Sequence, residues 1–143
     1  MSKSFVTAFY ATLSPSRRQL TYAAAGHNPP RLLRGGRVLA LDGEGGLPLG
    51  IAADESYAEA TLALDPGDLV LFYTDGITEA LARSDREGAR EQFDLRRLDD
   101  VLVRCAADSA EACLGRVCEE LARFTHGAPP EDDQTLVGLR YVP

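Results

Sequence analysis

A run of apolar residues that stops at an aspartate–glycine pair constrains the fold of this chain more than any other feature. Residues 68–73 read Asp-Leu-Val-Leu-Phe-Tyr, a run that is too short to span a membrane and rich in β-forming side chains. Such a run is typical of a strand that is buried on both faces. It leads to Asp75 and Gly76, and a carboxylate beside a residue without Cβ is well placed to hold a cation. The same pattern also fits an ordinary Asp-Gly turn, so these residues alone leave both interpretations open.

The part of the chain before this run is dominated by strand patterns. Short β-forming segments alternate with turns that contain proline or glycine. They predict strands at residues 5–13, 19–25, 31–34, 37–41 and 57–64. Pro29 and Pro30 remove two N–H donors, so strand pairing must break between the second and third of these segments.

The pattern changes after Gly76, where apolar residues begin to recur at helical spacing. We expect a short helix, a charged surface connection, two longer helices and a closing strand, at residues 76–82, 83–92, 94–105, 108–124 and 134–142. Asp94 can cap the first long helix, and Asp108 opens the second in a form that resembles a capping box. This order predicts an α+β domain in which helices cover a mostly antiparallel sheet or sandwich.

Composition limits the range of functions. The chain has 143 residues, enough for one domain with a sizeable core, and a formal net charge of -7. The negative charge argues against binding to nucleic acid or to an anionic membrane surface. No apolar run approaches ~20 residues and no signal-peptide pattern is seen, so we expect a cytoplasmic protein that does not enter a membrane.

The three cysteines do not form a recognisable metal or redox motif. Cys105, Cys113 and Cys118 have neither CxxC nor zinc-site spacing. Each falls on or beside the apolar stripe of a predicted helix. We therefore expect buried structural thiols.

A second pair of acidic residues lies just before the closing strand. Asp132 and Asp133 follow the turn at Pro129 and Pro130. Two core strands can bring distant ends together, and carboxylates that converge at strand ends suit Mg²⁺ or Mn²⁺. Taken alone, an acidic turn before a strand is usually only a turn. The combination of this pair with Asp75 suggests a metal site.

Five motifs occur in an order that resembles a known family. They are Phe-Val-Thr-Ala-Phe-Tyr at 5–10, Ala-Gly-His-Asn-Pro-Pro at 25–30, Pro-Leu-Gly-Ile at 48–51, Pro-Gly-Asp leading to Thr-Asp-Gly-Ile-Thr-Glu-Ala at 66–80, and Asp-Asp-Gln-Thr-Leu at 132–136. Together they resemble the metal-dependent type 2C (PPM) protein serine/threonine phosphatases, specifically the bacterial branch that contains SpoIIE and RsbU. The motifs extend over nearly the whole chain.

The resemblance implies a PPM-like β-sandwich with flanking helices and a two-metal centre, holding Mn²⁺ or Mg²⁺, at one edge. It implies metal-site positions at Asp75, Gly76 and Asp132, with Asp133 and His27 as supporting neighbours. A metal-activated water, and no protein nucleophile, would hydrolyse phosphoserine or phosphothreonine. The implied substrate is a phosphorylated bacterial signalling protein such as an anti-sigma-factor antagonist.

One family feature is missing from these 143 residues. The family's domain begins with strands that carry a Gly-Asp-Val-x-Gly-His-Gly motif, whose aspartate bridges the two metals. We therefore expect residues 1–143 to be the C-terminal portion of such a domain, N-terminally incomplete, or a reduced form of it. The alternative function is a catalytically silent remnant that binds a partner protein. In either form, an exposed sheet edge could support oligomers.

Overall fold

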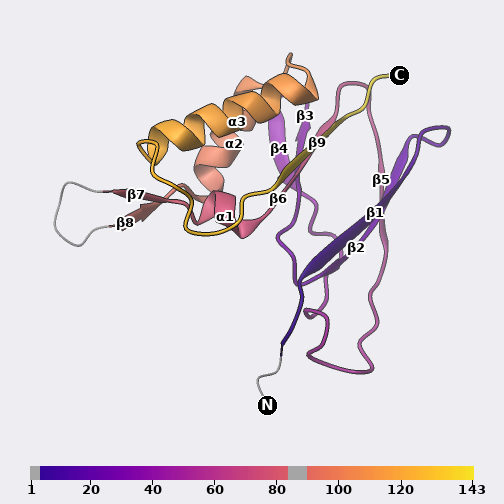
Figure 1. Ribbon diagram of the computed structural model, residues 1–143. Helices are drawn as coiled ribbons and strands as arrows, with labels where there is room; N and C mark the ends of the chain where they lie inside the picture. Colours follow the sequence, from indigo (N-terminus) through magenta and orange to yellow (C-terminus); the bar gives the residue numbers. More distant parts are fainter. Residues whose placement is uncertain (1–3, 84–89) are drawn as a thin grey trace.

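The computed structural model describes residues 4–83 and 90–143, which form two packed sheets, two long helices and a small hairpin (Figure 1). In chain order the elements are β1 (Ala8–Ser14), β2 (Gln19–Ala25), β3 (Arg31–Arg34), β4 (Arg37–Ala40), β5 (Ala60–Ala63), β6 (Leu69–Tyr73), α1 (Asp75–Thr78), β7 (Leu81–Arg83), β8 (Arg90–Gln92), α2 (Asp94–Arg104), α3 (Ala110–Phe124) and β9 (Leu136–Arg140).

The strands form antiparallel sheets with the orders β1-β2-β5, β4-β3-β6-β9 and β7-β8. The three-stranded sheet packs on one face of the four-stranded sheet, and α2 and α3 cover the other face (Figure 1). This arrangement confirms the predicted α+β architecture with helices that flank a β-sandwich.

Strand β6 lies at the centre of this arrangement, as its apolar run predicted. Leu69, Leu71 and Tyr73 belong to the core beneath the helices. Val70 and Phe72 point the other way, into the core between the two sheets. Residues of a strand alternate between its faces, so a strand between two cores must be apolar at every position. Pairing with β3 and β9 fixes the position of β6, so that its C-terminal end lies beside β9.

The two long helices form where the 3.6-residue apolar spacing predicted them. Their buried residues are Leu98, Val101 and Leu102 in α2 and Cys113, Val117 and Leu121 in α3. Asp94 caps α2, because its Oδ1 accepts a hydrogen bond from the Arg97 amide at 3.0 Å. The predicted capping role of Asp108 is wrong: Ser109 is the cap of α3, and its hydroxyl accepts from the Ala112 amide at 3.1 Å.

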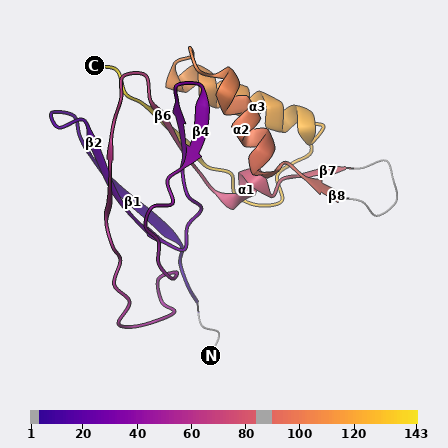
Figure 2. The ribbon, with the colours of Figure 1, turned by 180° about the vertical axis from the view of Figure 1, so that it is seen from behind.

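The segment after Gly76 differs most from prediction. Helix α1 is a single turn and does not continue to residue 82, because the chain turns into β7 and pairs with β8. The expected charged connection at 83–92 therefore ends in a strand, while its central residues, 84–89, lie outside the described part of the chain. The Phe93 amide donates to the Ala80 carbonyl at 2.8 Å and closes this hairpin. Both ribbon views show the hairpin extending away from the two larger sheets (Figure 2).

Other differences concern strand ends and one thiol. The strands expected at 5–13, 57–64 and 134–142 are shorter or displaced. Cys105 and Cys113 are buried as expected, but Cys118 is exposed, because it lies beside and not on the buried face of α3. Among the described helices, none is both long and apolar enough to cross a bilayer.

Candidate functional site

The C-terminal end of β6 and the segment that precedes β9 lie side by side. The antiparallel ladder pairs Tyr73 with Leu136, and the Thr74 amide extends it by donating to the Thr135 carbonyl at 3.1 Å. The turn that begins at Asp75 and the turn that contains Asp132 are therefore neighbours, although they are far apart in the sequence. The structure thus brings together the two turns that carry the acidic motifs.

Gly76 allows these turns to come into direct contact. It is buried in α1, and a Cβ atom at this position would collide with the backbone carbonyl of Asp133. On the other side, the Gln134 Nε2 donates to the Gly76 carbonyl at 3.0 Å. Any larger residue at position 76 would push the two turns apart.

Thr74 bridges the same two segments through its side chain. Its hydroxyl donates to the Asp133 carbonyl at 3.2 Å and accepts from the Thr135 amide at 3.0 Å. Neither Thr74 nor Gln134 was among the residues predicted from the sequence. The available signal was their position directly beside the acidic residues, but hydrogen bonds between such distant segments have no sequence pattern.

The carboxylates of this site face solvent. Asp75, Asp132 and Asp133 are all exposed, and Oδ1 of Asp132 accepts a hydrogen bond from the Asp133 amide at 2.8 Å. Asp132 and Asp133 line an open depression of about 470 Å³. The other residues of its lining are Pro130, Glu131 and Gln134. Within residues 4–83 and 90–143 none of the three aspartates forms an ion pair.

Exposed carboxylates without cationic partners are the donors that Mg²⁺ and Mn²⁺ prefer, so the donor set fits a hard cation. It is incomplete, however. The described residues hold no group of three or more His, Cys, Asp or Glu side chains placed to hold a metal ion. The two turns thus present carboxylates to solvent.

His27 lies between the first strand and the end of β6. Its Nε2 contacts the Tyr73 carbonyl at 3.2 Å, and its Nδ1 contacts the Thr7 hydroxyl at 3.4 Å. A carbonyl only accepts, so Nε2 is the donor to Tyr73, whereas the Thr7 hydroxyl can either donate to Nδ1 or accept from it. His27 is therefore bonded to the backbone of Tyr73, which lies two residues before Asp75. This bond fixes the end of β6.

The remaining motifs pack around the same end of the molecule. Gly26 has a φ of 65°, and a Cβ there would lie 2.5 Å from the Pro48 side chain. Val6 and Leu49 exchange backbone hydrogen bonds of 2.9 and 2.8 Å. The motifs at 5–10, 25–30 and 48–51 thus contact one another, and His27 links them to β6.

Tyr73 is a titratable residue at the end of β6, and its side chain faces the helices. Burial raises the pKa of its phenol above the usual value, while nearby Arg31 opposes this rise and Asp99 adds to it. A phenol with a raised pKa stays protonated near neutral pH. Tyr73 is therefore a packing residue and not a candidate base.

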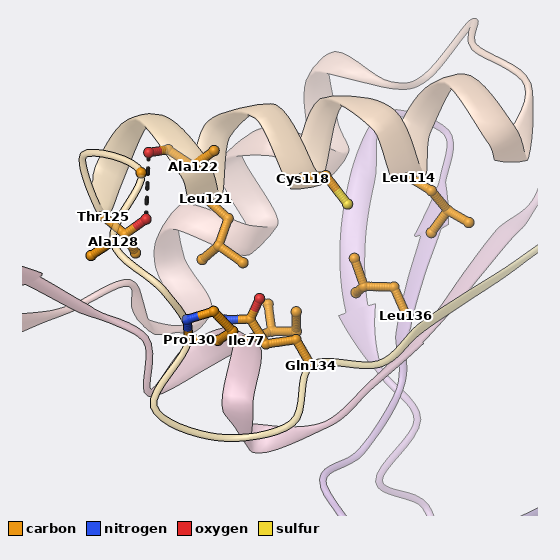
Figure 3. Close-up of a pocket in the computed structure, with 11 residues that line it drawn as sticks. Ile77, Leu114, Cys118, Leu121, Ala122, Thr125, Ala128, Pro130, Gln134 and Leu136 are labelled. Carbon is orange, nitrogen blue, oxygen red and sulfur yellow. Dashed lines mark hydrogen bonds between the residues drawn. The ribbon is translucent and has the colours of Figure 1, made fainter.

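A groove of about 490 Å³ lies next to the candidate site, beneath α3 (Figure 3). Its lining is mostly apolar and includes Ile77, Leu121, Pro130 and Leu136, and the Gln134 side chain lies beside Ile77 and Pro130. The Cys118 side chain, whose burial was predicted from the sequence, also lines this groove. Gln134 thus has apolar neighbours on one side and the Gly76 carbonyl on the other.

Comparison with known proteins identifies related sequences and folds. The profile of the family described as Stage II sporulation protein E (SpoIIE) matches residues 1–142. Phosphoserine phosphatase RsbU of Bacillus subtilis (strain 168) is 31% identical over 137 residues, which make up 95% of this chain and 39% of RsbU. The chain therefore spans about two fifths of that relative.

Two solved structures share the fold. The SiaA-PP2C domain of Pseudomonas aeruginosa matches 94% of this chain and 51% of its own with a TM-score of 0.77 and 24% identity. The Mn-presoaked phosphatase domain of SpoIIE from Bacillus subtilis matches 95% of this chain and 56% of its own, with a TM-score of 0.69 and 18% identity. Both likenesses place the two sheets and their helices in the PP2C-type fold.

Proposed function

The chain belongs to the SpoIIE family, and from that premise we propose that residues 1–143 are the C-terminal portion of a metal-dependent PPM phosphatase domain. The complete domain hydrolyses phosphoserine or phosphothreonine in a bacterial signalling protein. The matched relative RsbU bears the name phosphoserine phosphatase, which supports this choice of reaction. We place the reaction in the cytoplasm.

The observation that carries the proposal is the contact between the Asp-Gly turn and the closing acidic turn. Gly76 touches the backbone of Asp133, so Asp75 and Asp132 belong to one surface although 57 positions separate them in the sequence. An ordinary Asp-Gly turn would not need a second acidic turn pressed against its glycine. In this proposal, a shared cation is the reason that both adjoining turns carry an exposed aspartate.

The proposed metal site consists of Asp75, Gly76 and Asp132. The two carboxylates are the anionic ligands of Mn²⁺ or Mg²⁺, and Gly76 provides the space that brings them together. Asp133 supports the site because its amide orients the Asp132 carboxylate. His27 supports it because its imidazole holds the Tyr73 carbonyl, just before Asp75.

When bound, a pair of divalent cations supplies a water of lowered pKa as nucleophile and neutralises charge on the phosphoryl oxygens. The part of this chain is to hold carboxylates at the end of β6 and before β9. No side chain is assigned as a protein nucleophile. A third anionic ligand, the aspartate of an upstream Gly-Asp motif, completes the site in this proposal.

The partner is a phosphorylated protein, such as an anti-sigma-factor antagonist, in a partner-switching system. A protein substrate fits the open character of the site, because the depression beside Asp132 is broad and not enclosed. A phosphate on an exposed segment of a partner could reach such a site, whereas a small free substrate would find few enclosing walls.

A second candidate function is a catalytically silent phosphatase fold that binds a partner protein. It is favoured by β1, which has a strand partner on one side only among the described strands and whose Tyr10 is 68% exposed. An unpaired edge with apolar side chains is a surface to which another strand can add.

Calorimetric titration with Mn²⁺ and hydrolysis of p-nitrophenyl phosphate separate the two functions. We expect weak Mn²⁺ binding by the 143-residue chain that is lost in Asp75→Asn and Asp132→Asn, and very slow turnover. Adding an upstream segment with the Gly-Asp motif should raise turnover by orders of magnitude. Asp54→Asn, which neutralises an exposed carboxylate in a loop, is the matched control.

Two results would decide against the enzyme. Tight Mn²⁺ binding that is unchanged by Asp75→Asn would place the metal elsewhere. An extended chain that binds a phosphorylated partner but releases no phosphate, with Mn²⁺ present, would support the binding module instead.

A further inference from the structure

The side chains of Thr74 and Gln134 connect the two acidic turns beyond the point where the strand ladder ends. The last paired residues of β6 and β9 are Tyr73 and Leu136. Beyond this pair, the hydrogen bond of the Thr74 amide is the only backbone bond between the two segments among the described residues. Without other contacts the two segments would be free to diverge. Three side-chain hydrogen bonds join them there instead.

Thr74 uses the full capacity of one hydroxyl across this gap. The hydroxyl donates its hydrogen to the Asp133 carbonyl and accepts from the Thr135 amide. Thr74 is also the N-cap residue of α1, where a threonine side chain usually accepts from its own helix. It makes no such cap bond. The hydroxyl is thus turned away from its own helix and toward the other acidic turn.

Gln134 makes the reciprocal connection. Its amide nitrogen, 3.0 Å from the Gly76 carbonyl, ties the closing motif to the residue that follows Asp75. Asp75 therefore lies between two residues, Thr74 and Gly76, that are both bonded to the opposite turn. Asp132 precedes Asp133, whose carbonyl is held by Thr74. The backbone beside each aspartate is thus tied to the opposite turn.

We infer that Thr74 and Gln134 are positioning residues that hold the Asp75 and Asp132 carboxylates at the spacing required for one divalent cation. The inference rests on the proposed metal site, and it adds two residues that contribute no ligand atom. Residues that orient metal ligands commonly affect metal affinity about 10–100-fold when they are replaced.

The test compares Mn²⁺ affinity among variants of the 143-residue chain. Thr74→Val keeps the shape of the side chain and removes both hydrogen bonds, whereas Thr74→Ser keeps the hydroxyl. Gln134→Leu removes the amide, and the apolar groove beside it can accept a leucine. Thr21→Val is the matched control, because it removes a hydroxyl contact of 3.3 Å to Thr61, between β2 and β5 and away from the site.

We expect Thr74→Val and Gln134→Leu to weaken Mn²⁺ binding about tenfold or more, and Thr74→Ser and Thr21→Val to change it less than about threefold. Hydrogen exchange of the Thr135 amide provides a readout that does not depend on metal. Exchange should accelerate in Thr74→Val and remain slow in Thr74→Ser, since only serine can accept this hydrogen bond. Circular dichroism and thermal unfolding without metal show whether each variant is folded.

The outcomes distinguish a failure of the proposed metal site from a failure of the positioning role. If Asp75→Asn leaves Mn²⁺ binding unchanged, the metal site is wrong and the positioning role falls with it. If Asp75→Asn abolishes binding while folded Thr74→Val and Gln134→Leu bind as the unmodified chain does, the metal site stands and the positioning role is overturned.

Discussion

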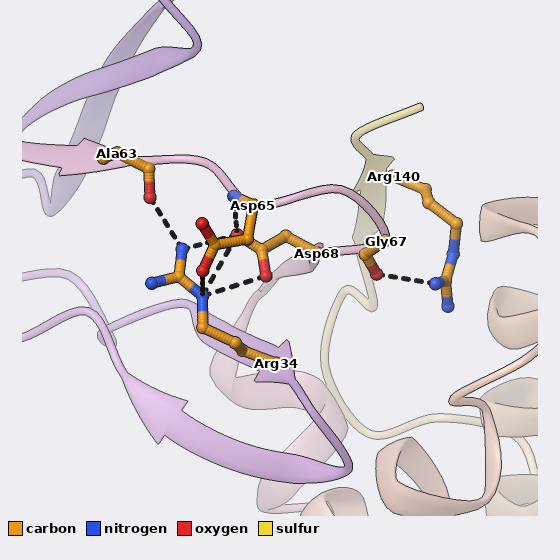
Figure 4. Close-up of polar contacts among 6 residues, drawn as sticks. All are labelled: Arg34, Ala63, Asp65, Gly67, Asp68 and Arg140. Carbon is orange, nitrogen blue, oxygen red and sulfur yellow. Dashed lines mark hydrogen bonds and ion pairs between the residues drawn. The ribbon is translucent and has the colours of Figure 1, made fainter. Parts of the chain in front are cut away.

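Arg34 and Asp68 form a two-pronged ion pair at the start of β6 (Figure 4). The guanidinium Nε donates to Oδ1 of Asp68 at 2.9 Å and Nη2 donates to Oδ2 at 2.5 Å. Asp68 is 2% exposed, and the hydrogen bond to its carboxylate raises the pKa of Arg34 above the usual value. Because Nη2 also donates to the Ala63 carbonyl at 2.7 Å, Arg34 connects the four-stranded sheet to β5 of the other sheet.

Replacing Arg34 by methionine should destabilise the fold strongly. The variant keeps an apolar stem but leaves the Asp68 carboxylate buried without its cation, which typically costs about 3–5 kcal/mol. Urea unfolding would measure the change. Arg37→Met, at an exposed position of β4, is the control. A loss below about 1 kcal/mol in Arg34→Met would show that the ion pair is not a structural requirement.

Two glycines should respond in opposite ways to replacement by alanine. Gly76→Ala should lower the free energy of unfolding by about 1–3 kcal/mol, because the new Cβ displaces the Asp133 carbonyl. Gly115→Ala, in the interior of α3 with nothing within 4 Å of the new Cβ, should raise it by about 0.5–1 kcal/mol. Equal responses at the two positions, measured by thermal unfolding, would contradict the close approach at Gly76.

Stability should fall at alkaline pH through the buried thiol of Cys113. Burial, with a smaller contribution from Cys105, raises its pKa from 9.0 to about 12. Between these values the unfolded chain releases the proton and the folded chain keeps it, so the folded state loses up to about 1.4 kcal/mol per pH unit. Tyr73, whose pKa is also raised, acts in the same direction.

Cys113→Ala tests this thiol separately from the other groups. The variant is less stable at pH 8 because it leaves a cavity, and its difference from the unmodified chain should shrink as the pH rises above 9. Cys118→Ala, at an exposed cysteine, is the control for the loss of a thiol. A difference for Cys113→Ala that stays constant with pH would show that its thiol ionises equally in both states.

The 143-residue chain should self-associate through the edge near β1. Val6 and Tyr10 are exposed beside or on a strand that has a partner on one side only among the described strands. Val6→Lys places a charge next to this edge and should shift the population toward monomer. Sedimentation velocity over a range of concentrations measures the effect. A monomer at high concentration without the substitution would contradict the prediction.

Features that depend on a single segment could be predicted from the sequence. Features that depend on contacts between distant segments could not. The apolar run ending at Tyr73 allowed a strand with two buried faces to be recognised. Helix α1 was overextended, because residues after Thr78 could continue a helix and only pairing with β8 prevents it. The acidic residues of the candidate site were proposed from residue type and motif position. The hydroxyl of Thr74 and the amide of Gln134 were missed, since their partners are known only once β6 and β9 have paired.

The pairing of β6 with β9 also determines the order in which the molecule can be completed during synthesis. Strand β6 is synthesised before β9, and helices α2 and α3 lie between them in the sequence. A nascent chain can form the hairpins β1–β2 and β3–β4 early, because their contacts are local. The two acidic turns can meet only after the residues of β9 have been synthesised. The candidate metal site therefore forms later than these local hairpins, and a chain cut short before β9 would have Asp75 but not the surface to which it belongs.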